Sequence, residues 1–262
     1  MEIWQAIVLG AVQGFAEFLP VSSSGHLLLM QRWLGVAEGG LFFDVMLHIG
    51  TLIPVFIVFF NQIIGLFKRP WNKMLFLIIA TIPAALTGVL LGDVVEGAFY
   101  GGDLLAAILL SVTFLLTAGE LFLSEKISKK NKKELPLSYK SSLTMGLAQS
   151  VAIVPGLSRS GTVISAGCFS KLSREENASF AFLMSIPIIL GAALVSGLDV
   201  IKSGVQIDFV PVLFGVLTAM TTGYIAIKVM LKVIKKANYK WFSLYLIIMA
   251  IASTATFVAF GA

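Results

Sequence analysis

Two segments of this chain carry hydroxyl, carboxylate, imidazole and guanidinium groups at spacings that suit phosphate chemistry. Residues 10–25 read GAVQGFAEFLPVSSSG, and residues 146–161 read GLAQSVAIVPGLSRSG. Glu17 and, directly after the segment, His26 belong to the first copy, whereas Arg159 belongs to the second. A site assembled from both copies would combine an acid, an imidazole and a guanidinium, a set that would suit a phosphate ester.

The two segments are copies of one pattern, shifted by 136 positions from Gly10 to Gly146. Aligned without gaps, they match at glycine and polar positions, pairing Gln13 with Gln149, Ser22 with Ser158, Ser24 with Ser160 and Gly25 with Gly161. The repeat divides the chain into halves of about 1–123 and 141–262, joined by a basic link at 124–140. We expect residues 1–262 to form one integral membrane domain built from these related halves.

Each copy predicts a polar tip between two short helices. Gln13 and Glu17 are four residues apart, so they lie on one helical face that leads to the break LPVSSSGH. A serine-rich turn that opens a helix offers hydroxyls, free N–H groups and the positive end of the helix dipole, which together suit an anion. The second tip adds Arg159, whose planar fork can hold a phosphate through two hydrogen bonds.

Four ionisable residues fall in apolar surroundings, where each costs several kcal/mol unless it is paired or hydrated. They are Glu17, Asp44, His48 and Arg159. Glu17 and Arg159 have a second interpretation as a structural ion pair, and even that would bring the two tips together. Asp44 and His48 are four residues apart on one face of a predicted span, where a supporting or metal-linked role and simple helix packing are both open.

The composition identifies the class of protein. Hydrophobic residues make up 58% of the 262 residues and charged residues only 13%, with a mean hydropathy of +0.95. These values indicate an all-α polytopic membrane protein and leave no sizeable water-facing domain. The first residues lack the basic start of a cleavable signal peptide and include Glu2. The single Cys168 excludes an intramolecular disulfide, and no Cys/His spacing resembles a zinc site.

Six apolar runs are long enough to cross about 30 Å of hydrocarbon, which takes about 20 helical residues. They lie at 42–60, 74–92, 104–123, 177–197, 210–227 and 241–260. The lysine-rich links 61–73, 124–140 and 228–240 are predicted to be cytoplasmic, and the acidic link 93–103 and the link 198–209 to be outside.

Counting crossings gives the repeated segments a topology. Residues 141–170 have to enter and leave on the cytoplasmic face, and residues 3–34 on the outer face. Each is therefore predicted to be a re-entrant helix-loop-helix hairpin, which with three spans makes an inverted-topology repeat. Both termini would lie outside in this arrangement, and an eight-span arrangement is its main rival.

At these residues the chain resembles a known family. QGFAEFLPVSSSGH, at 13–26, is similar to the first signature of the undecaprenyl-diphosphate phosphatases of the bacitracin-resistance type. PGLSRSG, at 155–161, is similar to their second signature, and FDVMLHIGTL, at 43–52, also matches. One position departs from the pattern, because the family usually has threonine four residues after the motif arginine, where this chain has Val163.

The resemblance implies removal of the terminal phosphate from undecaprenyl diphosphate, which regenerates the carrier lipid for peptidoglycan synthesis and confers bacitracin resistance. It implies a catalytic group of Glu17, Ser23, His26 and Arg159. Further phosphate contacts would come from Ser22, Ser24, Gly25, Ser158, Ser160, Gly161 and Thr162, with Gln13, Asp44 and His48 in support. Ser23 aligns with Arg159 in the repeat and is favoured as nucleophile with His26 as its proton partner, and Glu17 is expected to act as the base or to orient the nucleophile. Attack by His26, or by water that Glu17 activates, is an alternative.

The family also implies a divalent cation, Mg²⁺ or Ca²⁺, held by Glu17 with the diphosphate oxygens, although the neutral Gln13 lowers the local negative charge. The expected partners are the lipid substrate and the bilayer of the inner (plasma) membrane, not nucleic acid, and a homodimer is possible. The competing hypothesis is a flippase of a polyprenyl phosphate lipid, because broken helices in inverted repeats are typical of transporters. The Glu–Ser–His–Arg grouping favours hydrolysis, in a site that opens to the outer face.

Overall fold

The structure, a computed structural model, describes residues 1–36, 40–99, 104–130, 134–203, 208–236 and 239–260. These residues form eleven α-helices and one isolated β-bridge between Leu135 and Leu172. The helices are α1 (Ile3–Phe18), α2 (Ser23–Trp33), α3 (Gly40–Val58), α4 (Phe60–Leu66), α5 (Asn72–Phe99), α6 (Leu104–Lys130), α7 (Tyr139–Val151), α8 (Arg159–Phe169), α9 (Arg174–Ser203), α10 (Phe209–Lys236) and α11 (Lys240–Phe260). The predicted all-α fold is confirmed over this part of the chain.

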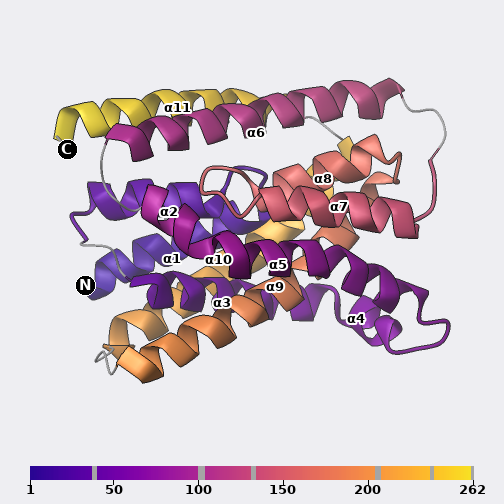
Figure 1. Ribbon diagram of the computed structural model, residues 1–262, viewed down its shortest axis with the longest axis horizontal. Coiled ribbons are helices and arrows are strands. Elements are labelled where there is room, and N and C mark those ends of the chain that lie inside the picture. The colour runs from indigo at the N-terminus through magenta and orange to yellow at the C-terminus, as the bar shows by residue number, and fades with distance from the viewer. Residues whose placement is uncertain (37–39, 100–103, 131–133, 204–207, 237–238, 261–262) are drawn as a thin grey trace.

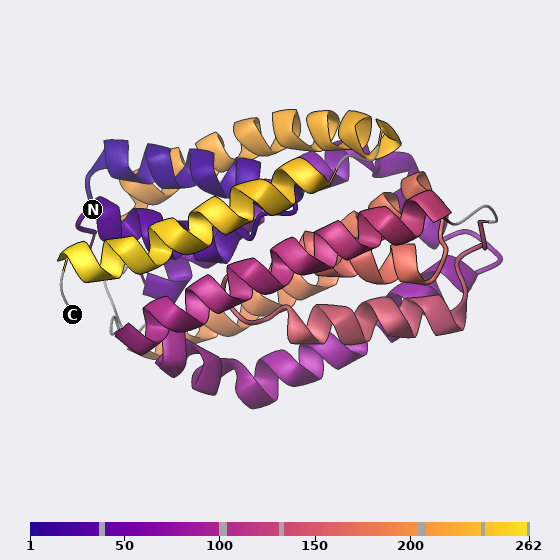
Figure 2. The same cartoon turned by 90° about the horizontal axis from the view of Figure 1, so that it is seen from above.

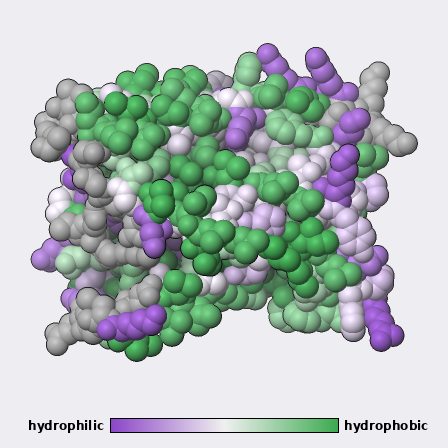
Figure 3. Space-filling view, viewed as in Figure 1, coloured by the Kyte–Doolittle hydropathy of each residue, from purple (hydrophilic) through white to green (hydrophobic). Residues whose placement is uncertain are grey.

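Four of these helices, α5, α6, α9 and α10, are long and apolar enough to cross a membrane. α3 and α4 form a fifth candidate, bent by 85° at the break between them, and α11 is apolar but shorter over its described side chains. Hydrophobic residues cover much of the face in Figure 3, and hydrophilic side chains gather at its right-hand end. The protein is therefore a multi-pass membrane protein, with four to five candidate spans by length and composition.

Each repeated segment folds into two short helices around a break. α1 packs against α2, and α7 packs against α8. Ser22 caps α2 by accepting a hydrogen bond from Gly25 N at 3.4 Å, and Ser158 caps α8 by accepting one from Gly161 N at 3.1 Å. A serine at the N-cap satisfies a backbone N–H that the first turn of a helix leaves unpaired. The repeated serines and glycines thus begin both of the second helices.

A short helix of each half packs against a long helix of the other half, and the two contacts are equivalent in the repeat. α1 lies along α10 of the second half, and α7 lies along α5 of the first (Figures 1 and 2). The repeated glycines allow both approaches. A Cβ on Gly10 would lie 2.3 Å from Gly215 O, and one on Gly146 would lie 2.6 Å from Ala80 O. α6 and α11 pair with each other, as do α3 and α9.

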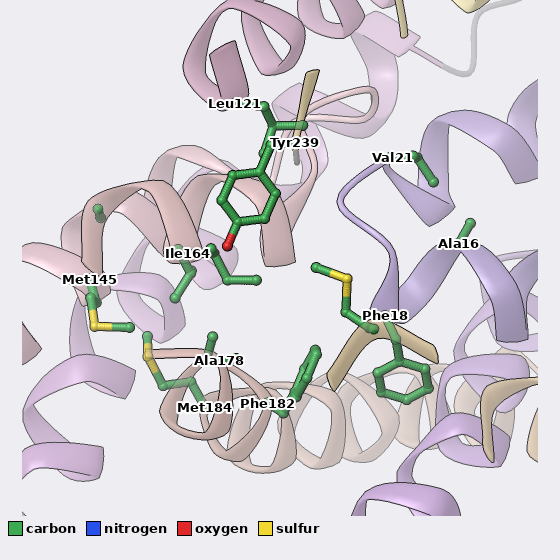
Figure 4. Packing of buried hydrophobic residues seen from close by; sticks show 14 of the residues in the cluster. Ala16, Phe18, Val21, Leu121, Met145, Ile164, Ala178, Phe182, Met184 and Tyr239 are labelled. Atoms are coloured by element: carbon green, nitrogen blue, oxygen red, sulfur yellow. The ribbon is translucent and has the colours of Figure 1, made fainter. Parts of the chain in front are cut away.

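The buried core draws side chains from both halves. Figure 4 shows Phe18, at the end of α1, beside Phe182 of α9, and their ring centroids are 5.6 Å apart in an edge-on contact. The ring centroid of Phe59, at the bend after α3, lies 5.7 Å from that of Phe182. Farther along the core, Ile164 of α8 lies with Met145 of α7. This packing holds α1 and α8, the helices that carry Glu17 and Arg159.

Figure 1 shows the directions in which the short helices α1, α2, α7 and α8 run. The start of α1 and the end of α11 lie on the same side of the molecule. α1 starts at that end and α2 returns toward it, whereas α7 starts at the opposite end and α8 returns there. The two breaks therefore approach each other in the middle of the molecule.

Candidate active site

Glu17 joins the two repeated segments. It lies in the last turn of α1, and its side chain is buried. Oε2 accepts hydrogen bonds from Ser23 Oγ at 2.7 Å and from Gln13 Nε2 at 3.1 Å. Oε1 accepts a hydrogen bond from Arg159 Nη2, which also makes an ion pair. This bond joins residues 142 positions apart in the sequence, so the two repeated segments meet at one carboxylate.

Two helix N-termini converge on this carboxylate. Ser23 and Arg159, which align in the repeat, are the first residues of α2 and α8. Within the described residues, four N–H groups of these first turns make no hydrogen bond, those of Ser23, Ser24, Arg159 and Ser160. Free N–H groups and the positive helix end make such a terminus suited to an anion.

Arg159 and His48 connect the polar cluster around Glu17 to the surface. The side chain of Glu17 is only 3% exposed, whereas that of Arg159 is 18% exposed and that of His48, from α3, is 26% exposed. Ser23 is also partly exposed. An anion that approaches the cluster therefore meets Arg159 and His48 before it meets the carboxylate, an order that favours binding of phosphate over its repulsion.

His26 lies one turn into α2, with both ring nitrogens engaged. Nδ1 is 2.7 Å from the carbonyl oxygen of Ser22, and Nε2 is 2.6 Å from the hydroxyl of Tyr245 in α11. A carbonyl oxygen only accepts, so Nδ1 carries a proton, and the neutral ring accepts at Nε2 the hydrogen bond that Tyr245 donates. The Tyr245 ring stacks on His26 at a centroid distance of 5.5 Å. His26 therefore ties the first tip to α11 and turns its nitrogens away from Ser23.

The second tip is held by threonines of α6. Ser158 N donates to Thr117 Oγ1 at 3.1 Å, and Thr117 Oγ1 donates to Gly156 O at 3.2 Å. Gly156 has a φ of +87°, and a Cβ there would lie 2.0 Å from Thr113 Oγ1. Glycine is required at this position both for the left-handed backbone and for the close approach. α6 thus fixes the turn directly before Arg159.

Thr117→Val tests this support. The change keeps the shape of the side chain but leaves the buried N–H of Ser158 and the carbonyl of Gly156 without their partner. We expect a loss of about 1–3 kcal/mol in the free energy of unfolding, the usual cost of such unpaired groups. Denaturant titration of the purified protein in detergent measures it. Thr117→Ser retains the hydroxyl and should stay close to the wild type, and equal stability of the valine variant would contradict this role.

The remaining predicted phosphate contacts have varied surroundings. Ser22 and Ser158 serve as helix caps, with Gly25 and Gly161 as the residues that they cap. Ser24 Oγ lies 3.5 Å from Ser22 Oγ, and Ser160 Oγ lies 3.3 Å from Ser158 Oγ and donates to Leu19 O at 3.2 Å. The Ser160 hydroxyl of the second tip therefore binds the backbone of the first tip.

Thr162 and Val163 face elements other than the Glu17 cluster. Thr162 Oγ1 donates to Glu120 Oε2 in α6 at 2.8 Å, and Glu120 is partly buried. Val163, which stands where the resembled family has threonine, is 1% exposed and belongs to the apolar core. The hydroxyl of Thr162, next to the position where this chain departs from the family pattern, is thus bound by a carboxylate of α6.

The two polar residues of α3 have different partners. His48 Nδ1 lies 3.1 Å from Glu17 Oε2 and 2.7 Å from Gln13 Nε2. Asp44, one turn earlier, accepts a hydrogen bond at Oδ1 from Gln31 Nε2 of α2 at 2.7 Å. The structure brings His48 and Gln13 to the carboxylate of Glu17, whereas Asp44 binds α2.

Sequence reasoning missed three residues that hold the tips, namely Tyr245, Thr113 and Thr117. Threonines in apolar spans usually bond the carbonyl of their own preceding turn, so their type carries no signal of a longer contact. Tyrosine near the end of a span is common for reasons unrelated to any site. The repeat offers no help either, because all three lie outside the repeated segments.

This chain is similar to known proteins over nearly its whole length. The family model described as bacitracin resistance protein BacA matches residues 6–252. A Carboxydothermus hydrogenoformans protein named undecaprenyl-diphosphatase is 40% identical over 255 residues, which cover 96% of each chain. A Methanobrevibacter smithii protein of the same name is 42% identical over 274 residues, again with 96% of each chain covered. A Bacillus cereus protein named undecaprenyl-diphosphatase 3 is 40% identical, with 92% of each covered.

Proposed function

Because this chain belongs to the bacitracin resistance protein BacA family, we propose that Glu17, Ser23 and Arg159 perform its reaction at the point where the two tips meet. The protein is an undecaprenyl-diphosphate phosphatase, which removes the terminal phosphate to give undecaprenyl phosphate. The expectation of a hydrolase is thus confirmed. The observation that carries the assignment of residues is the pair of contacts on one carboxylate, from Ser23 and from Arg159.

Binding of the diphosphate would redirect Arg159. The guanidinium pairs with Glu17 Oε1 in the structure. A diphosphate carries more negative charge than one carboxylate and can accept both arms of the guanidinium fork. The free N–H groups at the starts of α2 and α8 would add donors that are already oriented. Arg159 would then neutralise the phosphate while Glu17 becomes available as a base.

Ser23 is the nucleophile in this proposal. Its Oγ attacks the terminal phosphorus and its proton passes to Glu17 Oε2, the atom that it already bonds at 2.7 Å. The bond from that phosphorus to the bridging oxygen breaks, so undecaprenyl phosphate leaves with the electron pair. Glu17 releases its proton to solvent, takes one from the attacking water and returns it to Ser23 Oγ as phosphate departs. Direct attack by water that Glu17 activates is the competing route.

The decisive experiment measures phosphate release from undecaprenyl diphosphate by purified protein. Wild type, Glu17→Ala and Arg159→Ala are compared, and the lipid product is identified as the monophosphate. We expect release by the wild type and its near loss in both variants. Equal release by all three would contradict the assignment of this site.

We also propose the finer topology, with six spans, two re-entrant hairpins and both termini outside. Its support is the placement of the start of α1 and the end of α11 on one side of the molecule and of the two hairpins at opposite ends. Single cysteines in a variant that lacks Cys168, placed at Glu2 and at Lys140, test it with a membrane-impermeant reagent on intact cells. We expect labelling at position 2 and protection at position 140, and the reverse result would invert the topology.

A divalent cation fits the oxygen atoms of this site. Within the described residues, no group of three or more His, Cys, Asp or Glu side chains is placed to hold a metal. Gln13 Oε1, however, is a buried acceptor without a partner, on the amide whose Nε2 bonds the Glu17 carboxylate. Mg²⁺ is typically held by one or two carboxylates with substrate phosphates. We propose that Glu17 and Gln13 hold it together with the diphosphate, where it would neutralise developing charge.

Removal of the metal is therefore expected to slow the reaction. Chelation with EDTA should reduce phosphate release by at least about tenfold, because a cation on the phosphoryl oxygens contributes several kcal/mol to the transition state. Added Mg²⁺ or Ca²⁺ should restore the rate. Full activity after exhaustive chelation would remove the metal from the mechanism.

A further inference from the structure

The long helix α5 is buried near both ends and exposed between them. Ala80 and Ala84 are buried, and so is Phe99 at the other end of the helix. All residues from 85 to 94, which we call the exposed segment, are exposed or partly exposed. Because an α-helix turns once in about 3.6 residues, these residues face every direction. The exposed segment therefore stands away from the body of the protein.

The side of α5 that faces the protein can be followed along the helix. Ala84, Gly88, Leu91 and Val95 share one face, because they are spaced by three or four residues. Ala84 is buried, and Val95 packs against the apolar core. Between them, a Cβ on Gly88 would have no atom of the described residues within 4 Å, and Leu91 is 49% exposed. This face of α5 is therefore open between two points of contact.

The opening lies beside the second tip. α5 lies along α7, with Ala80 against Gly146, and both helices start at the same end of the molecule (Figures 1 and 2). α7 ends at Val151, less than two turns beyond Gly146, and α5 becomes exposed at the matching distance beyond Ala80. The exposed segment therefore runs past the break that leads to Arg159.

The equivalent helix of the other half is covered at the matching place. α10 lies along α1, which ends at Phe18 and there approaches Gly223. Beyond this contact, α10 continues with three residues that are buried in the core, namely Ala226, Ile227 and Met230. The repeat by itself would cover α5 in the same way, so the opening is a departure of one half from its equivalent.

Both sides of the opening are apolar. The exposed segment reads ALTGVLLGDV, with Asp93 as its one charged residue. Across from it, the second tip has Ile153, partly exposed, at the position that aligns with Glu17 of the first tip. Apolar surface that leads to a phosphate site suits a ligand with a hydrocarbon chain and an anionic head.

We propose that the first isoprene units of the substrate lie between the exposed segment of α5 and the second tip, so that the lipid reaches Arg159 sideways from the bilayer. The inference rests on the proposed site and adds a place for the chain to that of the diphosphate. Continuity with that site argues for this occupant, because the chain is bonded to the diphosphate and has to leave the polar cluster through apolar surroundings. In the proposed topology the opening lies in the outer leaflet.

Tryptophan substitutions test the proposal. Gly88→Trp and Leu91→Trp place a large ring in the opening, whereas Leu90→Trp places the same ring on another side of the helix, where Leu90 is 74% exposed. We expect the first two variants to raise KM for undecaprenyl diphosphate by roughly tenfold, because the added volume competes with the chain. The kcat should change little, since the chain is bound equally before and during the reaction. Leu90→Trp should stay close to the wild type in both constants.

Photocrosslinking identifies the occupant without relying on a rate. Benzoylphenylalanine replaces Leu91 or, as the matched control, Leu90, in phospholipid nanodiscs that contain a trace of radiolabelled undecaprenyl phosphate. We expect the label on the protein from position 91 and little from position 90, and excess unlabelled undecaprenyl phosphate should abolish it. Equal labelling at both positions would indicate bulk lipid, and a crosslinked dimer from position 91 would indicate a second copy. Either result would overturn the proposal.

The two hypotheses fail differently. If Gly88→Trp and Leu91→Trp have the same KM as Leu90→Trp, while Arg159→Ala releases no phosphate, the chain does not lie beside α5 and the phosphatase site remains intact. A lower kcat at unchanged KM would also overturn the proposal, because it would show an effect on the chemical step. Absence of phosphate release by the wild type would instead contradict the proposed function itself.

Discussion

Arg159→Lys is expected to release phosphate from undecaprenyl diphosphate at least about 100-fold more slowly than the wild type, as when one preorganised transition-state donor is lost. The change keeps a positive charge next to Glu17 but replaces a planar fork with a point charge, which cannot bind two phosphate oxygens in a fixed geometry. Initial rates of phosphate release from purified protein in detergent measure the effect. Arg174→Lys is the matched control, because Arg174 bonds Ser128 and lies at the start of α9. A rate within a factor of a few of the wild type would show that charge alone suffices.

Lysine is a sharper test than alanine for a physical reason. Arg159→Ala removes one partner of a buried ion pair and leaves the Glu17 carboxylate without compensation, which typically costs about 3–5 kcal/mol. A loss of activity in that variant therefore combines chemistry with stability. The double variant Glu17→Gln with Arg159→Ala removes both charges and is expected to recover stability without recovering activity.

Ser23→Ala is expected to lower the rate of phosphate release by at least about 1000-fold, as is usual when a nucleophile is removed. In the wild type, a reaction with substrate labelled in the terminal phosphate and quenched in acid should leave the label on Ser23. The alanine variant should carry none. Ser150→Ala is the control, because that hydroxyl bonds the carbonyl of Leu147 within its own helix.

The result also separates the nucleophiles. If water attacks directly, Ser23→Ala retains a substantial rate and no labelled serine is found in either protein. If His26 attacks, the label is acid-labile and survives in Ser23→Ala. We expect neither, because both nitrogens of His26 are engaged by Ser22 and Tyr245 while the Ser23 hydroxyl points to a base.

The repeat shows how far sequence alone reaches toward the site. Composition and apolar runs predict a helical membrane protein, and the gapless match predicts two similar tips, each begun by a serine cap. These are properties of single segments, set by hydropathy, by glycine and proline, and by capping chemistry that acts within a few residues. The structure has Ser22 and Ser158 as the caps of α2 and α8.

The contacts between segments far apart in the sequence could be determined only from the tertiary structure. The sequence predicts that Glu17 and Arg159 belong together and that Glu17 serves or orients the nucleophile, but not that His48 adjoins the same carboxylate. His26, predicted as the proton partner of Ser23, bonds Tyr245. These partners depend on how helices of one half cross those of the other, and no local pattern records a crossing angle.

What the sequence by itself determined is therefore the class, the family signatures and the inventory of reactive groups. What only the tertiary structure decided is their pairing. Thr162 shows the difference, because its place in the motif suggests a phosphate contact and its hydroxyl instead bonds Glu120 of α6. A buried hydroxyl in an apolar medium takes the nearest acceptor, and which acceptor is nearest is a property of the packed helices.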